Sequence, residues 1–548
     1  MQKKYITPVF RNALNKIGVP EETELHFEAP KNPDHGDFSC NVAMRSAKAM
    51  KKPPRAIAEE IIAALDYDDK LIENVSIAGP GFINIKFTDG FYAEVLKTMD
   101  ALGDQLGRSN LGKGQKVNVE YISCNPTGLL HLGHGRNASI GDTVSNLYEW
   151  TGWDVTREYY FNNAGNQMNN LAKSVYARYM EALGNADFPF PEDGYRGDYI
   201  RQIAADMKDE FGDKYKAGTE EDITSCRKAG EKWCFREIKK TLTRMNIEQD
   251  VFFNEESLYT DGKIDAIIKD FKDKNLTYEK EGALWLKLSE MGLEDDRVIV
   301  KSSGEPTYRL PDMAYHREKF ELGYDLMVEL FGADHIATVP DVQMGIKALG
   351  YDTNKVRTLI YQFVTLSENG EQVKMSKRTG KNYTLDDLLD EVGPDVVRFF
   401  FIMRSLNTHL EFDLGLAREQ SDKNPVFYLQ YAHARICSMI AKAEDLDIKI
   451  NNTADFALLN HKAEISLIKY IMNFGEAVKS SATKCEPQVL TDFLREAAAA
   501  FHVFYHECRI IGADSEELRD ARLKLASIAR IMMKNGLVIL GITTPEHM

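Results

Sequence analysis

Two histidines that flank a Leu-Gly pair are the first side chains along the chain whose spacing could perform chemistry. His131 and His134 follow a turn that contains Pro126 and Gly128. Between the histidines, Gly133 would let an adenosine lie close to the backbone, and the start of a helix attracts phosphate. Two imidazoles could donate hydrogen bonds to a developing negative charge. The segment therefore indicates nucleotide chemistry, although an isolated pair of this kind is more often a helix cap or part of a core.

A basic loop about 240 residues further along the chain supplies the second element of that chemistry. Between Gly370 and Gly380 stand Lys374, Met375, Ser376, Lys377 and Arg378. Cationic side chains in a mobile loop are suited to holding the β- and γ-phosphates of ATP while the α-phosphate is attacked. A basic loop alone is usually only solvated, so the prediction of an ATP site depends on both motifs together.

The first motif requires a strand, a turn and a helix to position it. Residues 117–122 read as a short strand with β-branched side chains, and a helix is expected from about 133 to 150. A second strand is expected at 154–161, which completes the opening of a mononucleotide-binding α/β unit. Later segments with a strand-like pattern are 297–300, 326–331 and 358–366.

In this order and spacing, the two motifs resemble the paired nucleotide motifs of class I aminoacyl-tRNA synthetases. Longer blocks resemble the arginyl-tRNA synthetases more narrowly, at 31–40, 119–131, 157–160 with 165–167, 307–308 with 312–316, and 428–435. The resemblance covers essentially the whole chain. It implies an α/β fold with a Rossmann-like class I catalytic domain, an N-terminal α+β domain and a C-terminal all-α anticodon-binding bundle.

Three domains are expected from the patterns along the chain and from this resemblance. Residues 1–110 would form the additional α+β domain, which in the family touches the tRNA elbow near the D-loop. Residues 115–410 would form the catalytic domain, with a charged helical insertion at about 168–285. Residues 411–548 read as helical and would form the anticodon-binding domain.

The reaction implied by the resemblance is arginine–tRNA ligation. L-Arginine and ATP would give arginyl-adenylate and pyrophosphate, and arginine would then pass to the 3′ end of tRNA(Arg). No side chain acts as a covalent nucleophile, so catalysis is positioning and electrostatics. The catalytic residues would be His131, His134, Lys374 and Lys377, with Gly133, Met375 and Ser376 also at ATP. Magnesium would accompany ATP without an evident protein site, and tRNA would be required for activation.

A pocket for the arginine side chain makes chemical sense from the matched residues. A guanidinium is planar, permanently charged and rich in donors, so it favours carboxylates. The carboxylates matched to the family are Glu120 and Asp312, with the hydroxyl of Tyr308 as a further polar wall. Asn125, with the backbone of Ser123, would hold the α-amino group, and His335 is a looser candidate for the rim. Two carboxylates would discriminate against lysine by geometry and against citrulline by charge. One departure is Asn163, where family members commonly carry aspartate.

Contacts with RNA are expected from both ends of the chain. Five cations without an acid among them, Arg45, Lys48, Lys51, Lys52 and Arg55, could form a phosphate-binding patch or simply a solvated helix face. In the C-terminal domain, Tyr431, His433 and Arg435 offer two rings and a cation for unpaired bases. Tyr431 and His433 could equally be core residues.

The composition limits the other classes of protein. A net charge of −16 argues against indiscriminate binding to nucleic acid, but not against a local basic face. Seven scattered cysteines form no Cys-x-x-Cys pair, which favours reduced thiols in a cytoplasm over structural zinc. No apolar run reaches membrane-spanning length and no secretory signal is evident, so we expect a cytoplasmic enzyme and, by analogy, a monomer.

Two alternatives of other classes compete with this interpretation. A catalytically idle tRNA-binding paralogue would not need both intact phosphate motifs. An adenylating nucleotidyltransferase that uses no RNA would not need the C-terminal helical domain. Among related synthetases, the cysteinyl and methionyl enzymes often carry metal-binding cysteines, and the carboxylate set suits a cation rather than the glutamate of the glutamyl enzyme.

Overall fold

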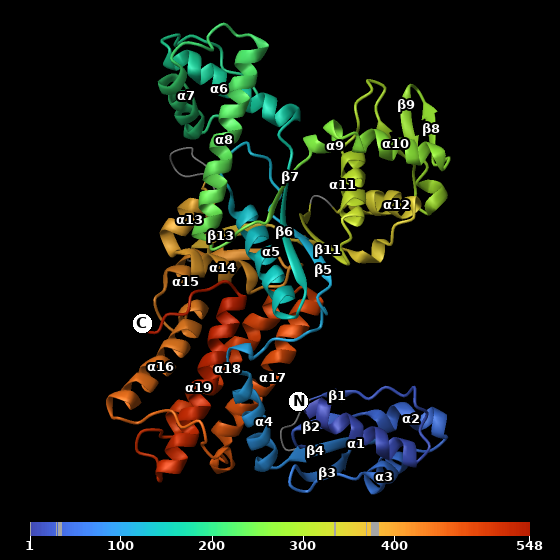
Figure 1. Ribbon diagram of the computed structural model, residues 1–548, viewed down its shortest axis with the longest axis vertical. Helices are drawn as coiled ribbons and strands as arrows, with labels where there is room; N and C mark the ends of the chain where they lie inside the picture. The colour runs from blue at the N-terminus through green and yellow to red at the C-terminus, as the bar shows by residue number, and fades with distance from the viewer. Residues whose placement is uncertain (1, 29, 31–34, 334–335, 369, 374–382) are drawn as a thin grey trace.

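In the computed structural model, a five-stranded parallel sheet forms the centre of the molecule (Figure 1). The structure describes residues 2–28, 30, 35–333, 336–368, 370–373 and 383–548. The strand order is β12-β11-β5-β6-β7, with bounds Val356–Tyr361, Leu326–Gly332, Lys116–Glu120, Asp154–Phe161 and Val251–Asn254. Every pairing is parallel, and the order of the strands reverses direction at β5. The expected α/β fold of Rossmann type is thereby confirmed.

Helix α5 (Leu132–Trp150) crosses from β5 to β6 and is buried on almost all sides. Of its 19 residues, 15 are buried, including serines and threonines. The hydroxyls of Ser139 and Thr143 donate to the carbonyls four residues earlier, at 2.9 and 2.8 Å. Glycine permits close contact with the sheet, because a Cβ on Gly141 would lie 2.2 Å from the Tyr121 side chain. The helix expected at 133–150 is therefore present and is central to the packing.

Two lobes project from the sheet on the same side of the molecule (Figure 1). The first has its own core and consists of α6 (Gly165–Ala182), α7 (Asp198–Phe211) and α8 (Glu220–Arg244). The second consists of α9 (Glu256–Thr260), α10 (Lys263–Asp273), α11 (Arg309–Glu321) and α12 (Val339–Leu349), with a three-stranded antiparallel sheet. That sheet pairs β8 (Thr277–Lys280), β9 (Ala283–Leu286) and β10 (Arg297–Val300). The segment 297–300 is thus a strand, but it does not belong to the parallel sheet.

The expected strand at 358–366 is corrected by the structure to two strands in different sheets. After β12 the chain leaves the parallel sheet, and β13 (Val364–Glu368) pairs with β14 (Glu371–Val373) and β15 (Leu410–Asp413). At the break, the buried guanidinium of Arg136 donates to the carbonyls of Gln362 (2.6 Å) and Thr408 (3.1 Å). Pairing of these carbonyls with a side chain interrupts the ladder. Helices α13 (Leu385–Val392), α14 (Pro394–Ile402) and α15 (Leu414–Arg418) complete this region.

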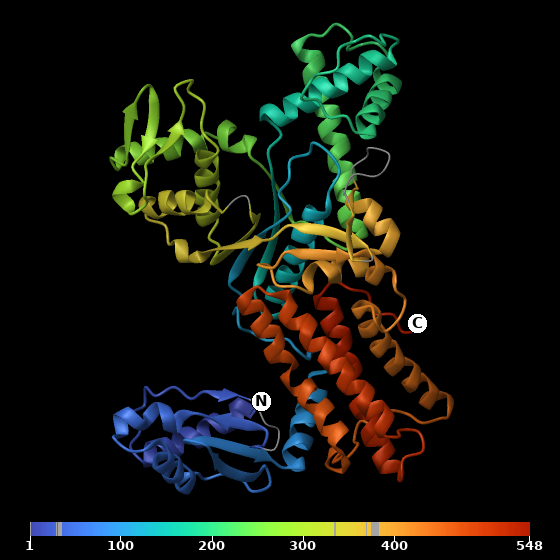
Figure 2. The ribbon, with the colours of Figure 1, turned by 180° about the vertical axis from the view of Figure 1, so that it is seen from behind.

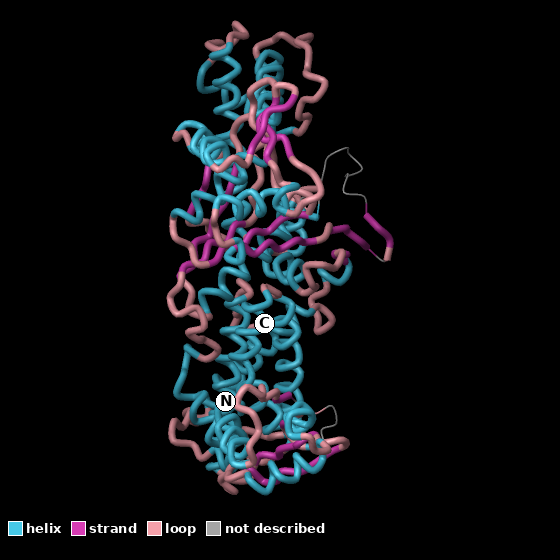
Figure 3. Tube along the Cα trace, turned by 90° about the vertical axis from the view of Figure 1, so that its right-hand side faces the viewer, coloured by secondary structure: helices cyan, strands magenta, loops and turns pink. Residues whose placement is uncertain are grey.

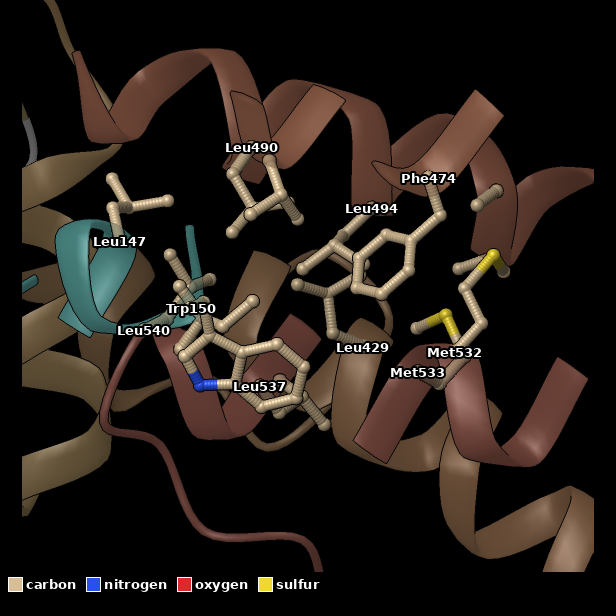
Figure 4. Packing of buried hydrophobic residues seen from close by; sticks show 14 of the residues in the cluster. Leu147, Trp150, Leu429, Phe474, Leu490, Leu494, Met532, Met533, Leu537 and Leu540 are labelled. Atoms are coloured by element: carbon tan, nitrogen blue, oxygen red, sulfur yellow. The ribbon is translucent and has the colours of Figure 1, made fainter. Parts of the chain in front are cut away.

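Four long helices form the C-terminal part and pack beneath α5. They are α16 (Pro425–Asp445), α17 (Lys462–Lys484), α18 (Pro487–Glu507) and α19 (Glu516–Ile539), and the side view shows this part as almost wholly helical (Figure 3). Leu147 and Trp150 of α5 lie beside Leu490 of α18 and Leu537 of α19 (Figure 4). The parallel sheet and the C-terminal helices therefore share one apolar core.

The N-terminal part is a four-stranded antiparallel sheet that is packed against three helices. Its strand order is β1-β2-β4-β3, with bounds Phe27–Glu28, Phe38–Cys40, Phe82–Phe87 and Ile72–Ala78, and its helices are α1 (Gln2–Lys16), α2 (Val42–Met50) and α3 (Pro54–Ala64). Helix α4 (Asp89–Leu102) leaves this sheet and runs along α17 (Figure 2). Lys469 Nζ lies 2.6 Å from Asp37 Oδ1, so an ion pair joins the N-terminal and C-terminal parts.

A buried arginine ties four distant segments together below the sheet. Arg398 of α14 is 1% exposed, and its guanidinium donates to Asp142 of α5 at 2.5 Å. It also donates to the carbonyl of Met245 (2.8 Å), which caps α8, and to that of Leu540 (3.1 Å), which caps α19. Gly541 must stay without a side chain there, because a Cβ would lie 2.0 Å from the Arg398 guanidinium.

Arg398→Met should lower the free energy of unfolding by about 3–5 kcal/mol, because it leaves the Asp142 carboxylate buried without a partner. The measurement is urea unfolding of the full chain followed by circular dichroism. Arg418→Met is the matched control, since Arg418 also pairs with carboxylates but its side chain is 43% exposed. That control should cost at most about 1 kcal/mol. Equal losses of unfolding free energy for both variants would contradict the larger contribution that we assign to the buried Arg398–Asp142 pair.

Candidate active site

A cavity of about 700 Å³ opens at the carboxyl ends of β5 and β11, where the strand order reverses. This is the crevice in which open α/β sheets bind their ligands. Its wall is formed by the turn after β5, the first turn of α5, the inner face of α11, the end of β11 and the start of β13. Residues far apart in the sequence therefore meet in one site.

The turn after β5 is held in a strained conformation at the cavity wall. Ile122 and Ser123 both have left-handed φ angles, 73° and 39°, and a β-branched residue rarely adopts this region. Asn137 of α5 stabilises the turn, because its Oδ1 accepts from the Ile122 amide at 2.6 Å. The Ser123 hydroxyl donates to Glu120 at 3.0 Å. Strain of this kind persists only where the surroundings over-determine it, and it is concentrated at functional sites.

The histidine pair forms the N-terminal cap of α5. Each backbone N–H donates to the Nδ1 atom of the other residue, from His131 to His134 and from His134 to His131, both at 3.3 Å. The rings are stacked with centroids 3.5 Å apart. Since both Nδ1 atoms are acceptors, the neutral rings carry their protons on Nε2. Two Nε2–H donors at a helix N-terminus are thus available to a phosphate.

The charge state of the pair follows from its position in the cavity wall. Desolvation lowers the pKa of His131, and desolvation together with the neighbouring His131 lowers the pKa of His134 to about 3. Both rings are therefore neutral in the empty site at physiological pH. They act as hydrogen-bond donors rather than as cations.

The first motif is also in contact with the segment that follows the second. The Leu385 amide at the start of α13 donates to the carbonyl of Leu130 at 2.9 Å. A Cβ on Gly135 would lie 2.6 Å from Leu385, so glycine is needed for this approach. Tyr383 lines the cavity. The second motif itself, Lys374, Met375, Ser376 and Lys377, lies outside the described residues.

A buried charge network lies behind the wall of the cavity that α11 forms. Lys319 of α11 is 1% exposed, and its Nζ lies 2.7 Å from Glu120 Oε2 and 3.3 Å from Glu329 Oε1. His316 Nε2 lies 2.9 Å from the same Glu329 oxygen. Burial alone would raise the pKa of Glu329, but the charges of His316 and Lys319 outweigh it and lower that pKa to about 2. Glu120 is therefore already paired with a protein cation.

Asp312 is the carboxylate that remains without a cation. It lies on α11 in the cavity wall, and its side chain makes no hydrogen bond or ion pair with any residue that the structure describes. Desolvation, together with the nearby carboxylates of Glu255 and Glu120, raises its pKa to about 7 against the opposing charge of His316. An unpaired carboxylate facing a cavity is matched by a cationic ligand.

Of the other residues expected to bind arginine, not all line the cavity. Ser123 lines the cavity. Asn125 does not, since it bonds Gln167 and the amide of Asn162 at 2.8 and 3.0 Å. Tyr308 is 57% exposed, and its ring lies under the guanidinium of Arg309, away from the cavity. His335 lies outside the described residues.

A neighbouring carboxyl group explains why position 163 carries an amide rather than a carboxylate. Its Nδ2 donates to Glu231 of α8 at 3.3 Å, and desolvation raises the pKa of that carboxyl. An aspartate at 163 would place a second carboxylate against Glu231. The amide avoids this repulsion and keeps a hydrogen bond to α8.

Sequence reasoning missed His316, Lys319 and Glu329. The first two follow Asp312 by four and seven residues, so one face of the helix carries all three, and this spacing was a usable signal. Nothing local marks Glu329, which reaches the network only because β11 lies beside β5.

The candidate RNA contacts also differ in their surroundings. In the N-terminal patch, Arg45 pairs with Glu24, Lys52 with Glu60 and Arg55 with Glu59, whereas Lys48 and Lys51 pair with no carboxylate within the described chain. In the C-terminal bundle, a second cavity of about 530 Å³ is lined by Tyr431, Arg435 and Tyr505. Arg435 stacks on both rings, 4.7 and 4.9 Å from their centroids. His433 is buried and bonded to the carbonyl of Pro545 (2.9 Å), outside that cavity.

Family models match three consecutive parts of the chain. An arginyl tRNA synthetase N-terminal domain matches residues 4–87, a class I (R) tRNA synthetase catalytic domain matches 98–398, and a DALR anticodon binding domain matches 429–548. The order of the three agrees with the order of structural parts described above.

Individual relatives are similar over the full length. The arginine–tRNA ligase of Salinibacter ruber is 48% identical, with all of both chains covered. That of Bacillus subtilis is 42% identical over all of this chain and 99% of the relative. Among solved structures, Thermus thermophilus arginyl-tRNA synthetase superposes with a TM-score of 0.78 at 21% identity over all of both chains, which shows a shared fold. The chain therefore belongs to the arginyl-tRNA synthetases, class I enzymes that use ATP to join arginine to tRNA.

Proposed function

We propose that the 700 Å³ cavity binds arginine and ATP side by side and that Asp312 recognises the guanidinium. The unpaired carboxylate of Asp312 carries this assignment, because the other acid in the arginine pocket, Glu120, is already neutralised by Lys319. Glu120 would then contribute hydrogen-bond acceptors and shape, while the charge selection falls to Asp312. Ser123, Asn125, Tyr308 and His335 complete the proposed set, and Asn125 and Tyr308 would have to turn towards the cavity.

ATP would lie over the first turn of α5. A Cβ on Gly133 would already be 3.0 Å from the His131 ring, so the glycine leaves room for adenosine there. The Nε2–H groups of His131 and His134 would donate to the phosphates, and Lys374, Met375, Ser376 and Lys377 would hold the pyrophosphate part. Magnesium would be bound by the phosphates of ATP. Among the described residues, no three His, Cys, Asp or Glu side chains are grouped as a metal site.

The chemistry needs no covalent enzyme intermediate. A carboxylate oxygen of arginine attacks the α-phosphorus, the bond to the pyrophosphate oxygen breaks, and the donors around the phosphates stabilise the added negative charge. A ribose hydroxyl at the 3′ end of tRNA(Arg) then attacks the carbonyl carbon, and AMP leaves. Both steps are accelerated by orientation and by preorganised donors.

The tRNA would be bound at both ends of the chain. Within the N-terminal patch, Lys48 and Lys51 have no carboxylate partner among the described residues. The cavity formed by Tyr431, Arg435 and Tyr505 suits an unpaired base between rings and a guanidinium. We assign the protein to the cytoplasm and to a monomeric state by analogy with its relatives. No described helix is long and apolar enough to cross a membrane.

Asp312→Asn should raise the KM for arginine at least about 30-fold, because the charged partner of the guanidinium is lost. Below pH 7 the wild-type KM should also rise as pH falls, since the Asp312 carboxyl, with a pKa of about 7, must lose its proton to bind. The measurement is arginine-dependent aminoacylation between pH 6 and 8.

The Asp312→Asn variant should show a flat pH profile for the arginine KM. Asp273→Asn, on the exposed side of α10, is the control and should behave like wild type. An unchanged arginine KM in Asp312→Asn would remove Asp312 from the pocket.

His134→Gln should lower the rate of arginine activation at saturating substrates by about 10²–10³-fold, because it removes a positioned donor to the phosphates. In the wild type, this saturated rate should not titrate with an imidazole between pH 5 and 8, since the pKa of His134 is about 3. Stopped-flow or steady-state ATP–pyrophosphate exchange measures both. His26→Gln, in the N-terminal domain, should have no effect, and a rate that titrates near pH 6.5 would refute the neutral-donor role.

ATP–pyrophosphate exchange with arginine should depend on added tRNA. We expect exchange only when tRNA(Arg) is present, which would establish that arginine is activated in the tRNA complex. Exchange without tRNA would keep the ligase assignment and remove the tRNA requirement. Absence of exchange under both conditions, with folded protein, would contradict the proposed catalytic roles.

A further inference from the structure

Helix α8 presents a face that consists almost only of cations. Between residues 223 and 244 the exposed residues are Lys228, Lys232, Arg236, Lys239, Lys240 and Thr243. At about 100° per residue, these positions fall within an arc of about 120°. We refer to the five cations as the α8 cationic face. No acid is exposed along this stretch of the helix.

The opposite side of α8 holds the helix rigidly in place. Cys226 belongs to the core of the first lobe, and Ile238 and Leu242 belong to the main core. A Cβ on Gly230 would lie 2.9 Å from Leu171, so α8 packs closely on α6. The cations are therefore displayed at fixed spacing on an ordered element.

The charge of this face is largely uncompensated. Lys228 and Lys232 make no ion pair with any described residue, and Lys239 lies over the ring of Phe252 at 4.3 Å. Two acids lie among these cations on the helix. Glu237 lies 3.0 Å from Arg236 and 3.7 Å from Lys240, and the half-buried Glu231 makes a hydrogen bond with Asn163. A solvated helix face normally mixes both signs at spacings of three and four residues. Here five exposed cations face two half-buried carboxylates, on a chain with a net charge of −16.

The C-terminal end of the α8 cationic face lies close to the elements that form the cavity. At its lower end, Arg244 of α8 pairs with Asp386 of α13 at 2.6 Å, and α13 packs against the first turn of α5. Lys228, Lys232 and Arg236 are spaced about 6 Å apart along the helix axis. A polyanionic strand that runs along α8 towards the cavity could therefore contact several cations at once.

We propose that the α8 cationic face binds the phosphate backbone of the tRNA arm whose 3′ end enters the cavity. The proposal rests on the proposed use of that cavity for aminoacyl transfer, because the 3′ end must reach it. RNA is the partner favoured by the fixed, repeated spacing of unpaired cations beside a site that must admit a tRNA terminus. The contacts are to phosphates, so they position the tRNA without reading its sequence.

The test is the combined variant Lys228→Gln/Lys232→Gln/Arg236→Gln in the full chain. Glutamine preserves helix propensity and removes only the charges. Each lost phosphate contact should reduce the slope of log K against log salt by about 0.7–0.9, so the slope should fall by about 2 and the Kd for tRNA(Arg) should rise at least about tenfold. Filter binding without arginine or ATP measures both quantities independently of catalysis.

The matched control is Lys269→Gln/Lys272→Gln/Lys274→Gln on and just after α10, which removes the same charge from exposed positions of the second lobe. It should leave the Kd and the salt slope at wild-type values. Should the triple α8 variant fail to fold, Lys232→Gln alone must still reduce the slope by about 0.7–0.9.

Two outcomes would overturn the proposal. The first is unchanged tRNA binding by the α8 variant, and the second is an equal loss of tRNA binding by the α10 control. An incorrect assignment of the cavity would give a different result. The wild type would then show no pyrophosphate exchange, although its tRNA binding would keep its salt dependence.

Discussion

The burial of helix α5 on almost all sides is the constraint on which the rest of the structure depends. A helix in this position cannot leave its polar groups to water, so they are paired within the protein: serine and threonine hydroxyls with carbonyls of the helix itself, Asp142 with Arg398, and Arg136 with backbone carbonyls at 2.6–3.1 Å. The pairs made by Asp142 and Arg136 join α5 to segments distant in sequence. The same contacts that satisfy the helix therefore fix its N-terminus, and with it the histidine pair, relative to β13 and the C-terminal bundle.

The arginine pocket that we propose follows from how charge is distributed around that helix. Glu120 and Glu329 would repel each other and any further carboxylate if they were unpaired, and Lys319 and His316 remove that repulsion from behind. The cavity would then present one uncompensated acid to arginine rather than three. One negative charge against one guanidinium gives a neutral bound state, which is the least costly arrangement in a desolvated site. Additional free carboxylates would raise one another's pKa values and weaken the pocket.

The sequence predicts the parts of this site that depend on local spacing. The unit 117–161, the position of His131 and His134 at a strand-to-helix turn, and the choice of Asp312 as a candidate carboxylate follow from short-range patterns and from the family blocks. The break after β12 was not predictable, because it depends on Arg136, which is 226 residues away from Gln362. Likewise, the outward position of Tyr308 and the pairing of Glu120 depend on tertiary contacts of α11. The charged character of α8 was visible, but which of its charges are exposed is decided by packing against α6 and the sheet.

Unpaired charges occur in two settings in this protein, and the setting determines what each can select. Asp312 stands in a desolvated wall, where an imperfect partner leaves a costly carboxylate, so small differences between ligands become large differences in affinity. The cations on α8 remain hydrated, so any phosphate backbone of suitable shape satisfies them, and added salt weakens the attraction. Discrimination among amino acids can therefore come from the cavity, whereas discrimination among tRNAs cannot come from α8. It has to come from sites that enclose bases, and in our proposal the cavity lined by Tyr431, Arg435 and Tyr505 is such a site.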